Sequence, residues 1–283
     1  MHREKVLKIK TSPGDCITEI ICKIICLFFF LFFAVPIVYV LISSVYSMGK
    51  WSLEGYILLL KNGQMLSGLK NSVLLTVIGT LYSLILEIPV AYVTSKKEFG
   101  WLANFFYYLS LFGIALLPLY LLLKKMNLLN NLWGIILPGG MSVYYMQQLR
   151  ARMLIQVAEL EDAAFLDGCG PVRYLLQICI PVMGPTIGVI GFFHACGYWG
   201  NTLLAKTILT DESKFPLTLV LNQIMIQNQT SSVLGSTEAV TSITTLCMAE
   251  FGMCVISALP MVVLFMLIKR YIKPVENAGG FIM

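Results

Sequence analysis

Apolar residues fill most of this chain in long runs, and short polar or charged stretches separate the runs. A helix needs roughly 20 mostly apolar residues to cross the hydrocarbon core of a bilayer. Five runs reach about that length, and a sixth, rich in glycine, is shorter. Pro138-Gly139-Gly140 in this sixth run should break a regular helix, either because the segment lines a translocation path or because it is a kink packed against a neighbouring helix. The pattern predicts an all-α integral membrane protein with six transmembrane helices, at residues 24–42, 72–93, 105–123, 132–146, 179–198 and 248–268.

The composition agrees with a membrane protein. Of the 283 residues, 58% are apolar and 12% are charged, and the mean hydropathy is +0.81. Soluble domains carry about 25% charged residues, roughly twice the share in this chain. We expect an N-terminal segment at 1–23, a transmembrane domain at 24–268 that includes a charged insert at about 154–185, and a C-terminal tail at 269–283. These parts leave no stretch for a separate catalytic domain.

Lysine and arginine are divided unevenly between the two sides of the predicted membrane. With the N-terminus in the cytoplasm, 13 of the 20 basic residues fall on the cytoplasmic side and 7 fall outside. Loops rich in Lys and Arg tend to stay in the cytoplasm. The bias predicts that both ends of the chain and the insert are cytoplasmic. No small-residue cleavage site follows the first apolar run, so we expect it to be a retained helix.

Residue types that carry most enzyme chemistry are scarce. The eight cysteines contain no Cys-x-x-Cys pair, and only two histidines are present, which is not the pattern of a metal site. The sequence has no glycine-rich phosphate loop. We therefore expect no catalytic residue, metal or cofactor in this chain, and no nucleic acid as a partner. An integral-membrane enzyme would need clustered His or acidic residues at one membrane face, a pattern that is not found.

The insert at 154–185 has the pattern of a helix, a sharp turn and a second helix. Acidic residues at 159–162 place negative charge near the positive end of the first helix. Asp167 and Gly168 predict its end, because glycine adopts the left-handed conformation at little cost. Pro171 suits the first turn of the second helix. A charged helical hairpin between two membrane spans predicts a docking site for a soluble partner.

This segment resembles the EAA loop, the cytoplasmic coupling motif of ABC importer permeases. The family pattern is Glu-Ala-Ala, two residues, Asp-Gly, nine residues, then Ile-x-x-Pro and a further Pro. The matching positions are Asp162, Ala163, Ala164, Asp167, Gly168, Ile178, Pro181 and Pro185. Asp162 replaces the family's glutamate, which keeps the charge but shortens its reach. Cys169 follows Asp-Gly where the family usually has a small residue.

The resemblance extends over most of the chain, to the maltose-type carbohydrate permeases and, among them, to the oligosaccharide permeases of Gram-positive bacteria. It is carried by Asn71-Ser72, Leu128-Leu129-Asn130, Trp199-Gly200-Asn201, residues 215–219 and Asn277-Ala278-Gly279-Gly280. It implies an ATP-driven sugar importer in the bacterial plasma membrane. This chain would pair with a second homologous permease, two ATPase subunits would hold ATP and Mg, and an extracytoplasmic binding protein would deliver the sugar.

The resemblance also implies which residues contact the ATPase. They are Glu161, Asp162, Ala163, Ala164, Asp167, Gly168, Ile178 and Pro181. Two other functions stay open. The same scaffold could carry a different solute, such as an amino acid, a polyamine or phosphate. An ion-coupled secondary transporter is the second alternative, although it would need several charges inside the membrane, and Glu87 is the one good candidate.

Six residues are candidates for the path of the solute. Glu87 lies deep in the second predicted span, where a carboxylate faces a cavity or a hydrogen-bonding partner. One possibility is a functional residue, an acceptor for sugar hydroxyl groups or a gate. The other is a structural one, a carboxylate that is hydrogen bonded across a helix contact or that lies close enough to the cytoplasmic side to reach water. Sugars also bind to aromatic faces and amides, which adds Tyr82, Tyr144, Tyr145, Trp199 and Asn201. We expect His194 to be packed and hydrogen bonded, with no role as a proton relay.

Overall fold

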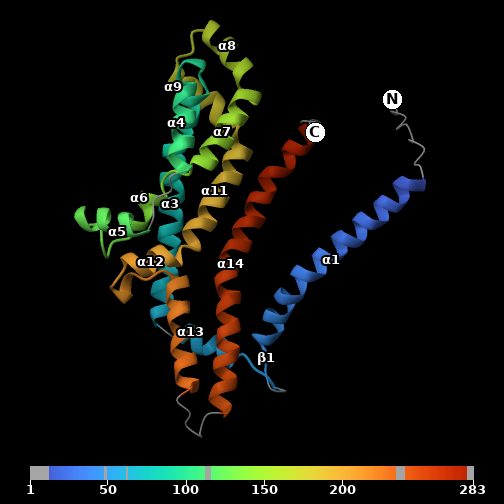
Figure 1. Cartoon of the computed structure of the whole chain (residues 1–283), viewed down its shortest axis with the longest axis vertical. Helices are drawn as coiled ribbons and strands as arrows, with labels where there is room; N and C mark the ends of the chain where they lie inside the picture. Colours follow the sequence, from blue (N-terminus) through green and yellow to red (C-terminus); the bar gives the residue numbers. More distant parts are fainter. Residues whose placement is uncertain (1–12, 48–49, 62, 112–115, 234–239, 279–283) are drawn as a thin grey trace. The chain divides into compact units, whose positions relative to one another are not determined.

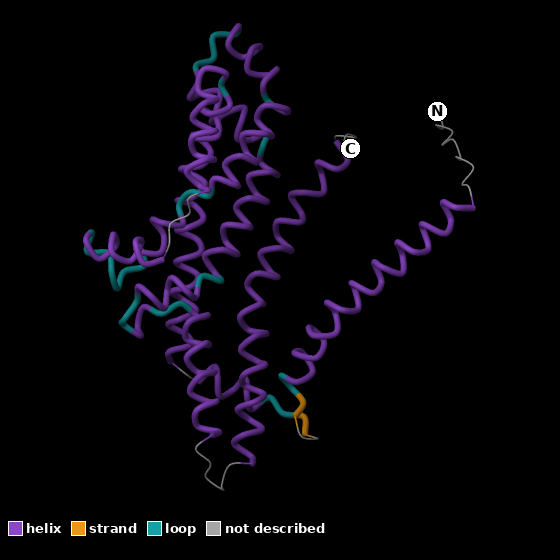
Figure 2. Tube along the Cα trace, viewed as in Figure 1, coloured by secondary structure: helices purple, strands orange, loops and turns teal. Residues whose placement is uncertain are grey.

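The computed structural model describes residues 13–47, 50–61, 63–111, 116–233 and 240–278. Helices account for nearly all of them, as Figure 2 shows, which confirms the predicted helical class. The departure from an all-α chain within these ranges is a hairpin of two-residue strands, β1 (Tyr46–Ser47) and β2 (Lys50–Trp51). The chain divides into two compact units, Met1–Tyr56 with Glu238–Val255 and Ile57–Thr237 with Ile256–Met283.

The first unit contains α1 (Pro13–Ser43), the β1–β2 hairpin, the start of α2 (Glu54–Lys61) and the first part of α14 (Val240–Ala278). The apolar side chains of α1 are almost all exposed, as expected for a helix that faces lipid. Tyr39 packs edge-on against Phe251 of α14, with ring centroids 5.8 Å apart. The Tyr56 hydroxyl donates to Ser44 Oγ at 2.8 Å and ties α2 to the end of α1.

The second unit is built around α3 (Gly63–Ser95), a helix of 33 residues and therefore about 50 Å long. The helices α7 (Val143–Gln156), α11 (Gly184–Trp199) and α13 (Leu217–Val233) pack against it. One buried cluster joins the C-terminal half of α3 to α7, α11 and the segment between them. A second cluster joins its N-terminal half to α6 (Trp133–Gly139), α12 (Thr202–Ile208) and α13.

The remaining elements of this unit are short. They are η1 (Lys97–Phe99), α4 (Gly100–Leu111), α5 (Leu116–Lys125), α8 (Ala158–Leu166), α9 (Pro171–Tyr174), the π-helical η2 (Leu175–Cys179), α10 (Ile180–Val182) and η3 (Glu212–Lys214). In Figure 1, α8 and α9 lie at one end of α3 and α13 lies at the other. The second unit thus carries separate structures at the two ends of its longest helix.

Several of the predicted membrane spans are present as long apolar helices. Thr18–Ser43, Gly63–Ser95 and Cys247–Arg270 are each long and apolar enough to cross a membrane. Two bent pairs would raise the number to five, namely Lys97–Leu111 with Leu116–Lys125 and Pro171–Val182 with Gly184–Trp199, the latter bent by 80°. Residues 112–115, in the middle of the third predicted span, lie outside the described ranges.

The fourth predicted span, 132–146, is not a single helix. The chain leaves α6 at Gly139 and enters α7 at Val143. Pro138, Gly139 and Gly140 explain the break, since proline lacks a donor and glycine weakens a helix. A Cβ on Gly140 would lie 2.3 Å from the Tyr82 ring, and one on Gly139 would lie 2.9 Å from the ring of Tyr198. Both glycines therefore allow the break to pack closely against aromatic side chains.

Candidate functional site

The insert predicted at 154–185 forms a helical hairpin at one end of α3. Within it, α8 ends at Leu166 with Asp167 as its C-cap, and Gly168 has a φ of +79°. Gly168 N donates to Phe165 O at 3.0 Å, and Cys169 N donates to Ala164 O at 2.9 Å. These two bonds form a Schellman motif, which satisfies the last carbonyls of the helix. The predicted left-handed stop at Gly168 is confirmed.

The return half of the hairpin begins at Pro171 and runs without a break in the helix to Val182, through a π-helical turn at Leu175–Cys179. Turns of this kind are often found at functional sites. The chain then bends by 80° at Met183, and Pro185 stands in the first turn of α11. Pro185 has no amide donor, so it is suited to a helix start.

The outer surface of the hairpin is apolar at several points. Leu166, next to the turn, is 90% exposed, Val172 is 72% exposed and Ile155 is 76% exposed. Leu160 and Leu176 are exposed as well, and so are Asp162 and Asp167. Apolar side chains on a polar background mark a surface for a partner when they are grouped. We call this group, Ile155, Leu160, Leu166, Val172 and Leu176, the hairpin surface.

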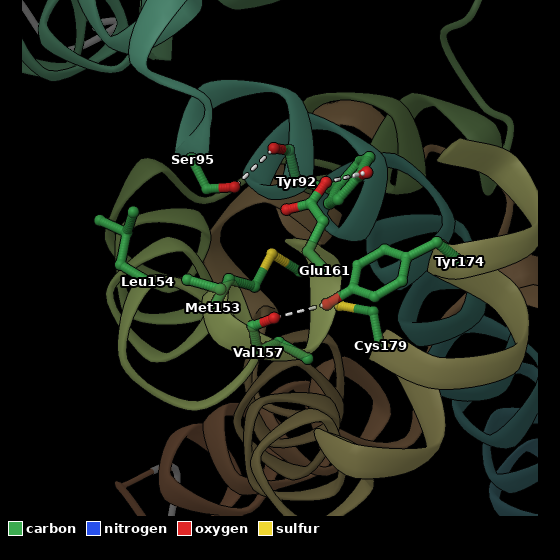
Figure 3. Close-up of a pocket in the computed structure, with 9 residues that line it drawn as sticks. Tyr92, Ser95, Met153, Leu154, Val157, Glu161, Tyr174 and Cys179 are labelled. Carbon is green, nitrogen blue, oxygen red and sulfur yellow. Dashed lines mark hydrogen bonds between the residues drawn. The ribbon is translucent and has the colours of Figure 1, made fainter. Parts of the chain in front are cut away.

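The inner side of the hairpin is anchored by Tyr174. Its ring is buried, and its hydroxyl donates to Val157 O at 2.6 Å, which joins α9 to the start of α8 (Figure 3). Ala164 is also buried in this cluster, so a larger side chain there would separate α8 from its support. A small cavity of about 40 Å³ lies beside Tyr174, Met153 and Cys179. The hairpin is therefore a packed structure and not a loose loop.

A group of charged and aromatic side chains ties the hairpin to the end of α3. Tyr92 of α3 donates its hydroxyl hydrogen to Glu161 Oε1 at 2.8 Å (Figure 3), and Lys96 forms an ion pair with the same carboxylate. The Lys96 ammonium lies 4.4 Å from the centroid of the Tyr92 ring and 5.6 Å from that of Phe165. Burial lowers the pKa of Lys96, an effect that Cys179 and Asp162 partly offset. We call Tyr92, Lys96 and Glu161 the brace.

The residues expected to contact an ATPase fall into two groups. Asp162, Ala163, Asp167, Gly168 and Pro181 are exposed on the hairpin. In contrast, Ala164 is buried, Ile178 packs against the buried cluster, and the Glu161 side chain is only 14% exposed and points toward α3. The sequence offered no sign that Tyr92 and Lys96 join this site, because they lie on another element more than 60 positions earlier in the chain.

Glu87 is fully buried, and both of its oxygens are engaged. Oε1 accepts a hydrogen bond from Ser142 N at 2.6 Å, and Oε2 lies 2.9 Å from His194 Nε2. The carboxylate therefore joins α3 to the start of α7 and to α11. Of the two possibilities left open for Glu87, the structure favours the side chain held across helix contacts. His194 is buried and hydrogen bonded, as predicted.

The other candidates for the solute path lie in different places. Tyr145 and Asn201 line one recess of about 200 Å³, and Tyr144 and Tyr145 line a second of about 240 Å³. Trp199 is buried, and its Nε1 donates to Ser257 O at 3.0 Å. Tyr82 packs edge-on against Trp133. Phe193, which lines both recesses, was not singled out in the sequence because it lies in an apolar run.

At the opposite end of α3, three of the segments that carried the sequence resemblance come together, those at 71–72, 128–130 and 215–219. Asn71 Nδ2 donates to Ser213 O at 2.8 Å and to Phe215 O at 3.2 Å. Asn130 Oδ1 accepts from the backbone of Thr210 and of Asp211. The hydrogen bonds from Ser213 hold the pKa of Asp211 below its usual range. These contacts bind the loop at 209–216 to α3 and to the turn before α6.

Within the described residues, no group of three or more His, Cys, Asp or Glu side chains could hold a metal ion.

No protein-family model matches the chain. Individual relatives are found, however. The chain is 29% identical over 179 residues to the polygalacturonan/rhamnogalacturonan transport system permease protein YtcP of Bacillus subtilis, covering 62% of this chain and 63% of YtcP. It is 27% identical over 219 residues to the arabinooligosaccharides transport system permease protein AraQ of Halalkalibacterium halodurans, covering 74% of this chain and 72% of AraQ.

The matched region spans just under two thirds of the length of YtcP and of a second Bacillus subtilis relative, protein LplC. Among solved structures, a chain of a bacterial ABC transporter involved in the import of the acidic polysaccharide alginate has the same fold. The TM-score is 0.77 at 22% sequence identity, and the match covers 93% of this chain and 99% of that one. The resemblance read from the sequence is confirmed: the chain is similar in sequence to permease proteins of transport systems for sugars, and it shares its fold with a chain of an ABC transporter.

Proposed function

We propose that the chain is one permease subunit of an ATP-driven importer for oligosaccharides. It crosses the bacterial plasma membrane six times, with the broken segment at 132–146 as its fourth span and both termini in the cytoplasm. Its partners are a second homologous permease, two ATPase subunits that hold ATP and Mg, and an extracytoplasmic binding protein. The solute class is supported by the name of AraQ, a permease of an arabinooligosaccharide transport system, and by that of YtcP, whose system transports polygalacturonan and rhamnogalacturonan.

The observation that carries this proposal is the hairpin at 154–185. Its outer side presents exposed leucine, valine and isoleucine beside two carboxylates, while its inner side is packed and tied to α3. A surface of this kind suits a soluble partner, because burying one exposed leucine contributes about 1.5–3 kcal/mol. Of the predicted ATPase contacts, Asp162, Ala163, Asp167, Gly168 and Pro181 are exposed. In this proposal they would meet the partner together with Leu166 and Val172.

Force applied to the hairpin would reach the membrane helices through two connections. The brace joins α8 to the last turn of α3, and Tyr174 joins α9 to Val157, the residue that links the end of α7 to α8. Packed, hydrogen-bonded elements move together as rigid bodies and do not deform continuously. Closure of two ATPase subunits on ATP would therefore shift α3 and its packed neighbours as a group. Glu161 acts in this scheme inside the chain, as a positioning residue.

Neither alternative function gains support from a specific contact. An ion-coupled carrier would be centred on Glu87, yet that carboxylate is fully buried and engaged by Ser142 and His194. A permease for another solute would keep the same hairpin, so only the transported compound distinguishes it.

The experiment that tests the proposal is purification of the chain in mild detergent after coexpression with the genes beside its own. Recovery of a second permease and an ATPase in one complex that hydrolyses ATP is the expected result. A chain that purifies alone, without ATP hydrolysis, would contradict the subunit assignment. Replacing Asp162 with Lys should weaken the recovery of the ATPase, because the exposed carboxylate would become a cation while the packed side of the hairpin is unchanged.

A further inference from the structure

A groove of about 250 Å³ lies between α3 and α6, near the N-terminal end of α3. Its lining is mostly apolar and consists of Leu74, Leu75, Ile78, Leu132, Trp133 and Ile136, together with Asn131 and Lys214. The Lys214 ammonium donates to Asn130 O at 3.0 Å, and Asn71 at the start of the second predicted span donates to the neighbouring Ser213 O. The polar part of the lining therefore lies at the N-terminal end of α3.

An exposed apolar stripe on α3 continues from the groove toward the middle of the helix. Leu74, Ile78, Leu81 and Ile85 are spaced three or four residues apart, so they share one face, and each is 38–68% exposed. From Leu74 to Ile85 the helix rises about 16 Å. One leaflet contributes about 15 Å to the hydrocarbon core of a bilayer. The groove and the stripe together thus match the length of one acyl chain.

The polar groups of the lining offer hydrogen-bond donors. Asn131 Oδ1 accepts from Trp133 N at 3.2 Å, which leaves the two amide hydrogens of Asn131 as donors. The indole N–H of Trp133 can only donate, and its ring lies edge-on against Tyr82. Lys214 adds an ammonium group on a side chain that is 45% exposed. A ligand with acceptor oxygens and a negative charge suits this set.

The charge of the lining is positive. Among the described residues that form it, Lys214 is the one charged side chain. Asp211 Oδ2 lies 3.9 Å from the Lys214 ammonium, but Oδ1 of this carboxylate accepts from Ser213, and Asp211 does not line the groove. Exposed ion pairs of this kind are weak. Glu212 is bonded to Gln64 instead. Lys214 can therefore meet a second anion at the groove.

We propose that this groove binds phosphatidylglycerol, with one acyl chain along the apolar lining and the α3 stripe and with the phosphate at Lys214, Asn131 and Trp133. The proposal rests on the topology within the proposed function, which places this end of α3 at the outer membrane surface, and it does not depend on the solute. Tryptophan and the ammonium group of lysine both favour the headgroup region. The bound lipid would hold the loop at 209–216 against the start of α6.

The test measures lipid binding to the complete complex in detergent by native mass spectrometry. The probes are dioleoylphosphatidylglycerol and dioleoylphosphatidylcholine, which carry the same chains and differ in net charge. Lys214→Gln removes the cation, and Ile78→Trp fills the groove. The matched controls are Lys206→Gln and Leu203→Trp, both at exposed positions on α12 outside the groove.

We expect Lys214→Gln to weaken the tightest binding of phosphatidylglycerol about fivefold and to leave that of phosphatidylcholine unchanged. Ile78→Trp should weaken both lipids at least about fivefold, because the chain loses its apolar site. Both controls should bind as wild type. Equal affinity of Lys214→Gln and wild type for phosphatidylglycerol would overturn the headgroup site, and equal affinities of Ile78→Trp and wild type would overturn the groove.

A second measurement identifies the occupant in the membrane. Leu81, on the exposed stripe, is replaced by p-benzoylphenylalanine, and cells that express the complex are irradiated. We expect an adduct with the mass of phosphatidylglycerol, and Lys214→Gln should lower its yield. An adduct with the second permease would overturn the proposal, because a protein would then cover the stripe. Neither measurement uses ATP or sugar, so a failure here leaves the importer assignment standing, and a chain that purifies alone can still be titrated with both lipids.

Discussion

Gly168 has a backbone conformation that few other residues adopt. Its φ of +79° ends α8, and a Cβ there would meet no atom within 4 Å, so space is not the constraint. The constraint is the left-handed conformation itself, which costs an ordinary L-residue about 1–2 kcal/mol. Asparagine tolerates this conformation, whereas a β-branched residue does not.

We therefore predict different outcomes for two substitutions at this position. Gly168→Asn should keep ATPase recovery and transport near the wild-type level. Gly168→Val should reduce both severely, because α8 would no longer end at the same residue, while insertion into the membrane is preserved. Copurification with the ATPase and uptake by proteoliposomes measure the two effects. Normal transport by the valine variant would mean that the turn plays no part in coupling.

The brace predicts a second effect at the residue scale. Lys96→Met keeps the length of the side chain but removes the cation that pairs with Glu161, which should cost about 1–3 kcal/mol of hairpin stability. We expect fewer solute molecules transported per ATP hydrolysed, with ATPase recovery largely kept. Lys97→Met, one residue away at an exposed position, is the control and should behave as wild type. An unchanged ratio of transport to hydrolysis in Lys96→Met would remove the brace from the coupling path.

The sequence predicted some of these residues and not others, for a physical reason. The stop at Gly168 and the helix start at Pro171 depend on local backbone chemistry, which the sequence carries directly. The orientation of Glu161 depends on Tyr92 and Lys96, which reach it only through tertiary packing. For the same reason the sequence left two possibilities open for Glu87, whose partners come from α7 and α11.

At the scale of elements, we predict that a polar substitution on the hairpin surface weakens binding of the ATPase to this chain. Leu166→Ser removes an exposed apolar side chain that would be buried by a partner, which corresponds to about tenfold weaker binding of the ATPase. Leu203→Ser, an exposed leucine on α12, is the matched control and should bind as wild type. Titration of the purified ATPase against the permease in detergent gives both affinities. Equal affinities would place the contact elsewhere.

Long apolar runs predicted the long helices well. The runs at 24–42, 72–93 and 248–268 lie inside α1, α3 and α14. The run at 132–146 does not form a single helix, since Pro138 and the two glycines after it end α6. The sequence did not predict the angle of 80° between the helices on either side of Met183. Hydropathy shows how apolar a segment is, but it does not show in which direction the segment runs.

At the scale of the whole molecule, the second unit has separate structures at the two ends of α3. The hairpin surface lies at the C-terminal end, and the loop at 209–216 is bound to the N-terminal end by Asn71 and Asn130. The recess of about 200 Å³ that Tyr145 and Asn201 line lies between them, over the break at 139–143. This order matches a chain that receives a solute on one side of a membrane and an ATP-driven motion on the other.

The central claim is that ATP hydrolysis by a partner drives sugar transport through this chain. The most direct test is uptake of tritiated oligosaccharide by proteoliposomes that contain the complete complex, measured with ATP, with a non-hydrolysable ATP analogue, and with an imposed proton or sodium gradient. We predict uptake with ATP alone, none with the analogue, and no effect of either gradient. Uptake driven by an ion gradient in the absence of ATP would contradict the claim and indicate an ion-coupled carrier.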